Sequence, residues 1–359
     1  MTTAETRTGI TGEVQTIDDA VAAALESGDT ETARRLYEKL GAIGARRDAL
    51  KTLLESALAE KAPSIPATIE HTETPSRLIT PDETREIMGA GRFFGAGEVK
   101  RIYGATITPE ELAQIPFILT ETEALNAKRL GHMITLHTDT LDNGQPLNML
   151  TLNNHAAKQD GRKLLFNTDW YRQGQPFAQT SDQKQWRETS MQPVPNTNYK
   201  NYLLQTDLIV KYFTEEVSKG VPLRPAYRQA KAEYEEKRPE IEKLLQRPDE
   251  GHLTARLPDG QPAPNWYVAG EMLESLAVTR LFRPTPVSIS QDTNTLQASG
   301  QEILQNAYTW TSGRSSYGRL VGFGNADSHG ARVGSWDPDD RVGVLLAVFS
   351  RGLSEPLNP

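Results

Sequence analysis

Apolar residues near the start of the chain recur at helical spacing. Between residues 30 and 60 they alternate at intervals of three and four, which is the pattern of a coiled-coil seam. The seam consists of Leu36, Leu40, Ile43, Leu50, Leu54 and Ala57, with Arg47 as one charged interruption. Residues 1–62 are therefore predicted to be helical. The pattern fits both a helical hairpin that packs on itself and a coiled coil that joins several chains.

The next stretch has the composition of a linker. Residues 63–80 contain three prolines and many Thr and Ser residues, and we expect them to be extended. Thr80 is then followed by Pro81 and two acidic residues, which is typical of a helix N-terminus. The folded body is accordingly expected to span residues 81–355.

Strand and helix patterns alternate along this body. Period-two alternation in "HMITLHTD", from His132, predicts a strand, and the Asn143–Gly144 pair after it is a hairpin signal. From about residue 201 to 282, apolar residues recur at helical spacing and predict an inserted helical block. Strands are expected again from Val287 onward.

The last apolar run, Val342–Ser350, is apolar on both faces that a strand would present. It predicts a central strand that is buried on both sides. One face would carry Val344, Leu346 and Val348, and the other Leu345, Ala347 and Phe349. Because strand material lies on both sides of a helical block, we expect an α+β fold whose sheet is built from both ends of the body.

Composition narrows the class of function. The formal net charge of −8 argues against a general nucleic-acid binder, and the chain contains no cysteine, which excludes disulfides and Cys-ligated zinc. Neither a secretory signal nor a membrane span is visible in the sequence. We therefore expect a cytoplasmic protein by default, while a phage particle or export without a cleaved signal stays open.

Candidate chemistry is sparse. Asp327, Ser328 and His329 contain the residue types of a hydrolase triad. Their adjacency in sequence argues against one, because the members of a catalytic triad converge in space from distant positions. Asp337, Asp339 and Asp340 form an acidic group around Pro338, which fits either a calcium site or an Asx-bonded turn. We expect no cofactor, no resident metal and no enzymatic activity.

A polar, irregular stretch precedes the last apolar run. "TWTSGRSSYGRLVGFGNADSHGARVGSWDPDD", Thr309–Asp340, is rich in Gly, Ser, Arg, Asp and aromatic residues, the composition of adaptable binding surfaces. We expect Trp310 and Trp336 to be in the core and Tyr317 to be exposed. Lys, Glu, Gln and Met make up 67 of the 359 residues but are absent from the 49 residues Asn306–Ser354.

The C-terminal stretch resembles the end of C-type-lectin-like domains of the formylglycine-generating type. The resemblance is carried by "WTSGRSS" (Trp310–Ser316) and "VGVLLAVFSRG" (Val342–Gly352), and more weakly by "QWRETSMQPVPNTNYKNYL" upstream. The oxidases of that superfamily work through cysteines, which this chain lacks. Its other branch includes the variable proteins of diversity-generating retroelements. There, adenine-directed mutagenesis of Asn codons cannot produce Lys, Glu, Gln or Met codons, which matches the depletion.

The resemblance implies a ligand-binding protein that displays a diversifiable recognition surface on a lectin-like fold with a helical insertion. The ligand would be a protein or a glycan. The alternative is a structural or assembly protein of a phage-like particle, whose N-terminal helices form a homo-oligomer. The implied ligand-binding residues are Ser312, Arg314, Ser315, Ser316, Tyr317, Arg319, Asn325, Asp327, Ser328, His329, Arg332, Ser335 and Asp337.

Overall fold

The computed structural model describes residues 77–166, 168–172, 174–327 and 329–354, and these belong to one compact unit. The predicted helices of residues 1–62 lie outside the described residues. Of the predicted linker, residues 77–80 are described, and Ile79 donates a backbone hydrogen bond to Leu119. The α+β class is confirmed by the mixture of helices and sheets in the described part.

Short capped helices open the body. Thr80 and Glu83 form a capping box at the start of the first of them, with Pro81 in the first turn, as the sequence indicates. Thr120 and Glu123 repeat the motif further along. The helices are α3 (Pro81–Met88), α4 (Ala96–Tyr103), α5 (Pro109–Gln114) and α6 (Glu121–Leu130).

The first sheet joins the start of the body to its end. Its strand order is β1-β2-β3-β10, with β1 parallel to β2 and the other pairs antiparallel. The strands are β1 (Phe93–Phe94), β2 (His132–His137), β3 (Gln185–Ser190) and β10 (Ser350–Gly352). The predicted strand from His132 is confirmed, and so is the expectation that the sheet is built from both ends of the body.

The hairpin expected after Asn143–Gly144 is wrong. The chain turns there but continues into helix α7 (Met149–Asp160). The Asn148 side chain accepts hydrogen bonds from the backbone N–H groups of Leu150 and Thr151, so it caps this helix. Two short helices, α8 (Asp169–Arg172) and α9 (Pro176–Gln179), follow before β3.

One face of the first sheet carries a buried polar network around His137. Its ring bonds Asp182 at 2.9 Å through Nδ1 and Asp292 at 2.8 Å through Nε2. Thr189 of β3 donates to Asp292 at 2.9 Å and contacts the Ser350 hydroxyl of β10 at 2.9 Å. All five side chains are buried, so their hydrogen-bonding groups must be satisfied within the protein. We call this the His137 network.

The opposite face carries a second network, around Arg351. Arg351 donates to Glu188 at 2.7 Å and to Glu123 of α6 at 3.1 Å. Glu123 also pairs with Arg224 at 2.8 Å, and His132 donates to the second oxygen of Glu188 at 2.7 Å. Neighbouring residues of β10, Ser350 and Arg351, thus enter different networks because successive side chains of a strand point to opposite faces. We call this the Arg351 network.

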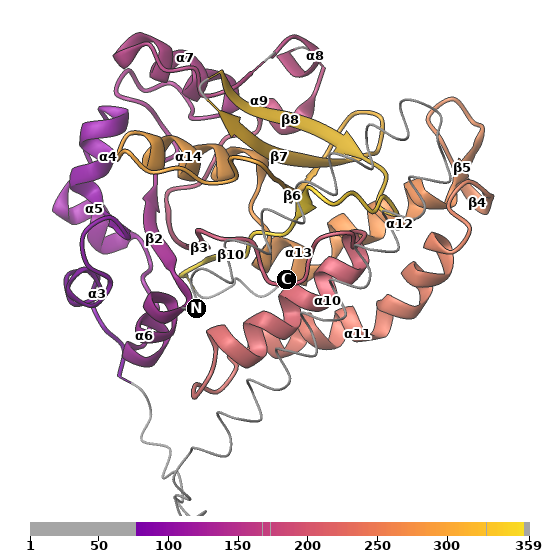
Figure 1. The fold of residues 1–359 in the computed structure, drawn as a ribbon, viewed down its shortest axis with the longest axis horizontal. Helices are drawn as coiled ribbons and strands as arrows, with labels where there is room; N and C mark the ends of the chain where they lie inside the picture. The colour runs from indigo at the N-terminus through magenta and orange to yellow at the C-terminus, as the bar shows by residue number, and fades with distance from the viewer. Residues whose placement is uncertain (1–76, 167, 173, 328, 355–359) are drawn as a thin grey trace, which may run out of the picture. The chain divides into compact units, whose positions relative to one another are not determined.

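Helix α14 (Pro286–Gln297) replaces the strand expected from Val287. Thr285 caps its first turn and Pro286 stands at its start. Every residue from Pro286 to Leu296 is buried, although most are Ser, Thr, Asn, Gln or Asp. Figure 1 shows α14 between β2 and β7, where it packs on both sheets. Burial by the surrounding elements therefore overrides a local composition that is poor for helices.

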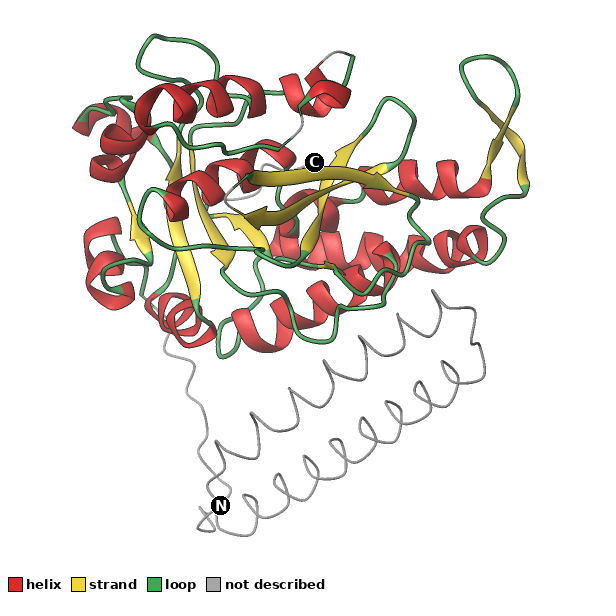
Figure 2. Cartoon of the chain, turned by 45° about the horizontal axis from the view of Figure 1, so that its top comes forward, coloured by secondary structure: helices red, strands yellow, loops and turns green. Residues whose placement is uncertain are grey.

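Helices occupy the block predicted at about 201–282. They pack around a second apolar core that contains Phe213, Phe282, Trp310 and Phe349. The last part of the block, residues 265–282, forms two helices because Leu276 between them is extended. The helices are α10 (Tyr202–Tyr212), which continues into a π-helical turn (Phe213–Val217), α11 (Pro225–Leu245), α12 (Asn265–Ser275) and α13 (Ala277–Phe282). Between α11 and α12, strands β4 (Gly251–Arg256) and β5 (Pro262–Pro264) form a hairpin that projects from the helices (Figure 2).

The second sheet holds the polar stretch identified in the sequence. Its order is β8-β7-β6-β9, antiparallel except that β9 runs parallel to β6. The strands are β6 (Tyr308–Arg314), β7 (Leu320–Asp327), β8 (Gly330–Trp336) and β9 (Leu345–Leu346). Trp310 is fully buried as predicted, whereas Trp336 is half-buried at the rim of the second core.

The single central strand predicted over Val342–Ser350 is wrong. The segment is split between β9 in the second sheet and β10 in the first, each at a sheet edge, and Val344 is exposed. Between the two strands, the N–H of Val348 donates to the Thr309 hydroxyl and that of Phe349 to the Ser190 hydroxyl. These side chains take over the backbone bonds while the chain crosses from one sheet to the other. Burial of the segment from Leu345 onward, apart from the half-buried Leu346, agrees with the prediction.

Candidate functional site

The structure divides the predicted ligand-binding residues between the two ends of β7. One group lies around the turn between β6 and β7, and the other around the turn between β7 and β8. The eight residues of β7 separate the two turns by about 23 Å. The expectation that these residues cluster on one surface is therefore not met. Ser328 lies outside the described residues.

At the β6–β7 turn, Ser315 is buried and Arg314 is mostly buried, so neither offers the exposed side chain expected of a ligand-binding residue. The Arg314 side chain is 12% exposed, lies over the ring of Tyr267 and pairs with Glu271 and Glu274 of α12. It also donates to the Gly318 carbonyl at 2.9 Å, which closes the turn. Helix α12 comes from the inserted block, so the residues that bury Arg314 are distant in sequence.

The tip of the same turn is exposed, as expected. Tyr317 is 71% exposed, and Ser316 is held by two 2.9 Å hydrogen bonds with the amide of Gln175. Arg319 pairs with Asp337 at 2.9 Å. Ser312 and Ser335 are half-buried within β6 and β8, with the Ser312 N–H bonded to Pro284.

The acidic group that follows β8 is an Asx-bonded turn. The N–H of Asp337 donates to the carboxylate of Asp340 at 3.0 Å, and the N–H of Asp340 donates to the Asp337 carbonyl at 3.0 Å. Partial burial raises the pKa of Asp337 and of Asp339. Within the described residues, no group of three or more His, Cys, Asp or Glu side chains is arranged to hold a metal ion.

The β7–β8 turn presents a connected set of charged groups. The N–H of His329 donates to the carboxylate of Asp327 at 2.7 Å, and this bond is the main cause of the lowered pKa of Asp327. Arg332 approaches the other carboxylate oxygen at 3.8 Å. In the amide orientation that satisfies its neighbours, Asn325 accepts from Arg332 at 3.0 Å and donates to the Gln305 carbonyl at 3.1 Å.

Phe166 completes this surface, and sequence reasoning missed it. Its ring lies 5.2 Å from the guanidinium of Arg332 and remains 41% exposed. The backbone of Phe166 is bonded to Ala331 of β8, which in turn is bonded to Leu164. No sequence pattern near Phe166 predicts this contact, because Phe166 and Ala331 are 165 residues apart in the chain. We call Phe166, Asn325, Asp327, His329 and Arg332 the turn face.

Gly330 makes the close approach at the turn face possible. Its φ is +106°, and a Cβ at this position would lie 2.8 Å from the carbonyl carbon of Leu165. Only glycine combines that backbone conformation with so little space. The segment that carries Phe166 can therefore lie directly against the turn.

Two hollows flank His329, whose side chain is 69% exposed. A hollow of 370 Å³ includes Lys163, Phe166 and Asp169, and one of 530 Å³ includes Gln301, Glu302 and Asp327. Both share Lys163 and His329. The arrangement offers an imidazole, an amine, carboxylates and an arginine stacked on an aromatic ring, which together suit recognition of a mixed polar and aromatic surface.

In comparisons with known proteins, no family model, no curated protein and no solved structure matches the chain. Across the described residues, no helix has the length and apolar character needed to cross a membrane.

Proposed function

We propose that this protein is a ligand-binding protein and that the turn face recognises a protein ligand. The observation that carries the proposal is the position of His329, which stands exposed between two hollows beside the Arg332–Phe166 pair. Arginine and aromatic side chains dominate the residues that contribute most to protein–protein affinity. The hollows have room for side chains of a partner.

Rigidity of the turn face supports the same function. The N–H of Phe166 donates to the carbonyl of Ala331 in β8, and Arg332 is held by Phe166, Asp327 and Asn325. Binding groups that are already in place lose less conformational entropy when a ligand binds. The β6–β7 turn is a weaker candidate because Arg314 is paired with Glu271 and Glu274 of α12.

The sequence resemblance to variable proteins of diversity-generating retroelements supports a diversifiable surface. Tyr317, Asp327 and His329 have exposed side chains, while Trp310 of β6 and Phe323 of β7 are buried. Exposed positions tolerate substitution with small changes in stability, usually within about 0.5 kcal/mol. Variation at the exposed positions would thus alter recognition without unfolding the scaffold. We propose the lectin-like fold and the diversification of the exposed positions together with the ligand-binding function.

Two experiments test the proposal. Full-length protein would be screened against a displayed protein library and a glycan array. We expect a protein hit whose affinity falls at least about tenfold in Arg332→Ala and is unchanged in Lys243→Gln, an exposed charge change on α11. Binding to glycans alone would show that the ligand is a glycan and not a protein. A protein ligand whose affinity is unchanged in Arg332→Ala would contradict the turn face as the binding site.

Gene sequencing tests the diversification separately. We expect a near-copy of the 3′ end that differs at adenines, close to a reverse-transcriptase gene. Substitutions among natural copies should fall on codons for Tyr317, Asp327 and His329 and spare Trp310. A locus without the near-copy would contradict the proposed diversification. The ligand-binding function would then be tested by the library and glycan screen alone.

One observation favours the alternative function in particle assembly. Leu253 in β4 is 91% exposed on the projecting β4–β5 hairpin, so its side chain is accessible to a neighbouring subunit. Light scattering of the full chain, Leu253→Ser and a deletion of residues 1–62 tests this. Loss of an oligomer in either variant supports assembly, while a monomeric full chain rejects it.

A further inference from the structure

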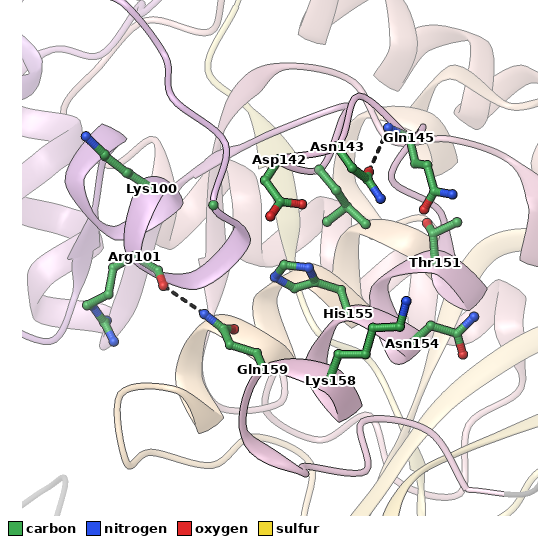
Figure 3. A pocket seen from close by; sticks show the side chains of 12 residues that line it. Lys100, Arg101, Asp142, Asn143, Gln145, Thr151, Asn154, His155, Lys158 and Gln159 are labelled. Atoms are coloured by element: carbon green, nitrogen blue, oxygen red, sulfur yellow. Dashed lines mark hydrogen bonds between the residues drawn. The ribbon is translucent and has the colours of Figure 1, made fainter.

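A separate hollow of 440 Å³ lies between α4, α7 and the loop that joins β2 to α7 (Figure 3). Figure 3 shows Lys100 on α4, Lys158 on α7 and Asp142 on the loop around it. Arg101 also borders the hollow, so three cationic side chains accompany one carboxylate. This balance is opposite to that of the whole chain, whose formal net charge is −8.

Hydrogen bonds fix the walls of this hollow to one another. The last turn of α4 ends in carbonyl groups that have no partner inside a helix. His155 Nε2 donates to the Ile102 carbonyl at 3.1 Å, and Gln159 donates to the Arg101 carbonyl at 3.0 Å. The N–H of Asp142 donates to the Tyr103 carbonyl at 3.3 Å. Helix α7 and the loop therefore cap α4, and the hollow exists before any ligand arrives.

The residues on the neighbouring face of α7 are not used for this capping. Asn154 and Lys158 are four residues apart, so they lie on one face of the helix, next to the face of His155 and Gln159. Within the described residues, the side chains of Asn154 and Lys158 have no hydrogen-bond or ion-pair partner, and the same holds for Lys100 and Asp142. Two amines, an amide and a carboxylate thus remain available at a preformed hollow.

The available groups restrict the chemistry of a ligand. Two amines attract an anionic group. Asp142 repels a bare anion and instead accepts hydrogen bonds, as does His155 Nδ1 when the ring is neutral, because Nε2 already donates to a carbonyl. A ligand must therefore carry hydroxyl donors as well as negative charge. The lining includes no Phe, Tyr or Trp side chain, and its one large apolar residue, Leu141, is buried, so it offers no large ring or apolar surface for a nucleobase.

We propose that this hollow binds an anionic sugar, with a phosphate or carboxylate group at Lys100 and Lys158 and sugar hydroxyls at Asp142, Asn154 and His155. The proposal does not rest on the turn face, since it uses different residues on different elements. Sugar phosphates and sugar carboxylates share the chemistry on which it depends, and the two are separated by experiment.

Calorimetric titration of the full-length protein at low salt provides the test. The probes are glucose 6-phosphate, glucuronate, glucose, inorganic phosphate and AMP. We expect glucose 6-phosphate or glucuronate to bind at least about tenfold more tightly than glucose or inorganic phosphate alone. The tighter of the two identifies the anionic group. Equal binding of AMP or of inorganic phosphate would overturn the proposal, as would failure of both anionic sugars to bind.

Variants locate the binding. Lys158→Gln should weaken the anionic sugar about tenfold or more, whereas Lys243→Gln, the same change on α11, should leave it unchanged. Asp142→Asn should bind inorganic phosphate more tightly, because the repelling negative charge is removed. The difference in affinity between inorganic phosphate and glucose 6-phosphate should therefore be smaller in this variant. Equal effects of Lys158→Gln and Lys243→Gln would place the binding elsewhere and overturn the assignment. A thermal melt of each variant verifies that it is folded.

Discussion

Arg351 in the last strand donates a 2.7 Å hydrogen bond to Glu188 in β3, and both side chains are sealed from solvent. The contact joins positions 163 residues apart and fixes the final strand to the sheet. On the other face of that sheet, Ser350 enters the His137 network. The polar stretch before β9 therefore lies next to the segment β9–β10, which connects the second sheet to the first.

Removal of Arg351 should be strongly destabilising. Arg351→Met would leave the buried carboxylates of Glu188 and Glu123 short of a positive charge, and breaking a buried pair in this way costs about 3–5 kcal/mol. Arg319→Met breaks an ion pair at the surface and should cost less than about 1 kcal/mol. Urea denaturation of both variants measures the difference. Equal losses of stability in the two variants would show that the buried ion pairs of Arg351 contribute no more to the free energy of unfolding than the surface pair of Arg319.

Stability should fall on both sides of mildly acidic pH. Burial alone would lower the pKa of His137, but the carboxylates of Asp292 and Asp182 raise it to about 9. A group whose pKa is raised on folding stabilises the protein fully below its unfolded pKa, about 6.5, and loses this contribution as pH rises through 9. The free energy of unfolding should therefore decrease between pH 6.5 and 9.

The acid side follows from Glu188. Burial would raise its pKa, but Arg351 and His132 lower it to about 2. Its contribution is present above the unfolded pKa, about 4.3, and is lost as pH falls toward 2. Urea denaturation from pH 3 to 9 should give a maximum between about pH 4.5 and 6.5, with His329→Gln, an exposed histidine, as the control. A profile that is flat from pH 6.5 to 9 would argue against a charged His137.

Trp310 should behave as core and the turn residues as surface. Trp310 is fully buried and packs edge-on against Tyr202 and Trp336 at ring distances of 5.4 and 5.9 Å. Its change to Ala should cost about 3–5 kcal/mol. The Tyr317→Ala/His329→Ala double variant should lose no more than about 1 kcal/mol in total. If the double variant melts as early as Trp310→Ala, the exposed turns are structural and not available for recognition.

Gly330→Ala should destabilise the turn face. The added Cβ would meet backbone atoms of Leu165 and Lys163 within 3 Å at a φ that alanine rarely adopts. We expect a loss of about 1–3 kcal/mol and increased amide hydrogen exchange at Phe166. Gly97→Ala is the matched control, because it adds a Cβ in open space on α4 and should stabilise by up to about 1 kcal/mol. Unchanged exchange at Phe166 in Gly330→Ala would contradict the role assigned to this glycine.

Local rules were sufficient where the determining contacts are close in sequence. The cap at Thr80, the strand from His132, the helices of the 201–282 block and the burial of Trp310 all follow from spacing and from the size of side chains. The exposure of Tyr317 and His329 was likewise predictable, because polar tips of tight turns have no local element to cover them.

Long-range contacts decided the rest. Helix α14 has a composition unfavourable to helices and forms because both sheets bury it, and Val342–Ser350 is divided because Thr309 and Ser190 offer hydrogen bonds from different sheets. Arg314 is buried by α12 and Phe166 joins the turn face through β8, which no local pattern could indicate. The sequence by itself determined which segments are apolar, capped or polar. Which of them meet was set only by the tertiary structure, since the free energy of burial depends on the partner surface and not on the segment alone.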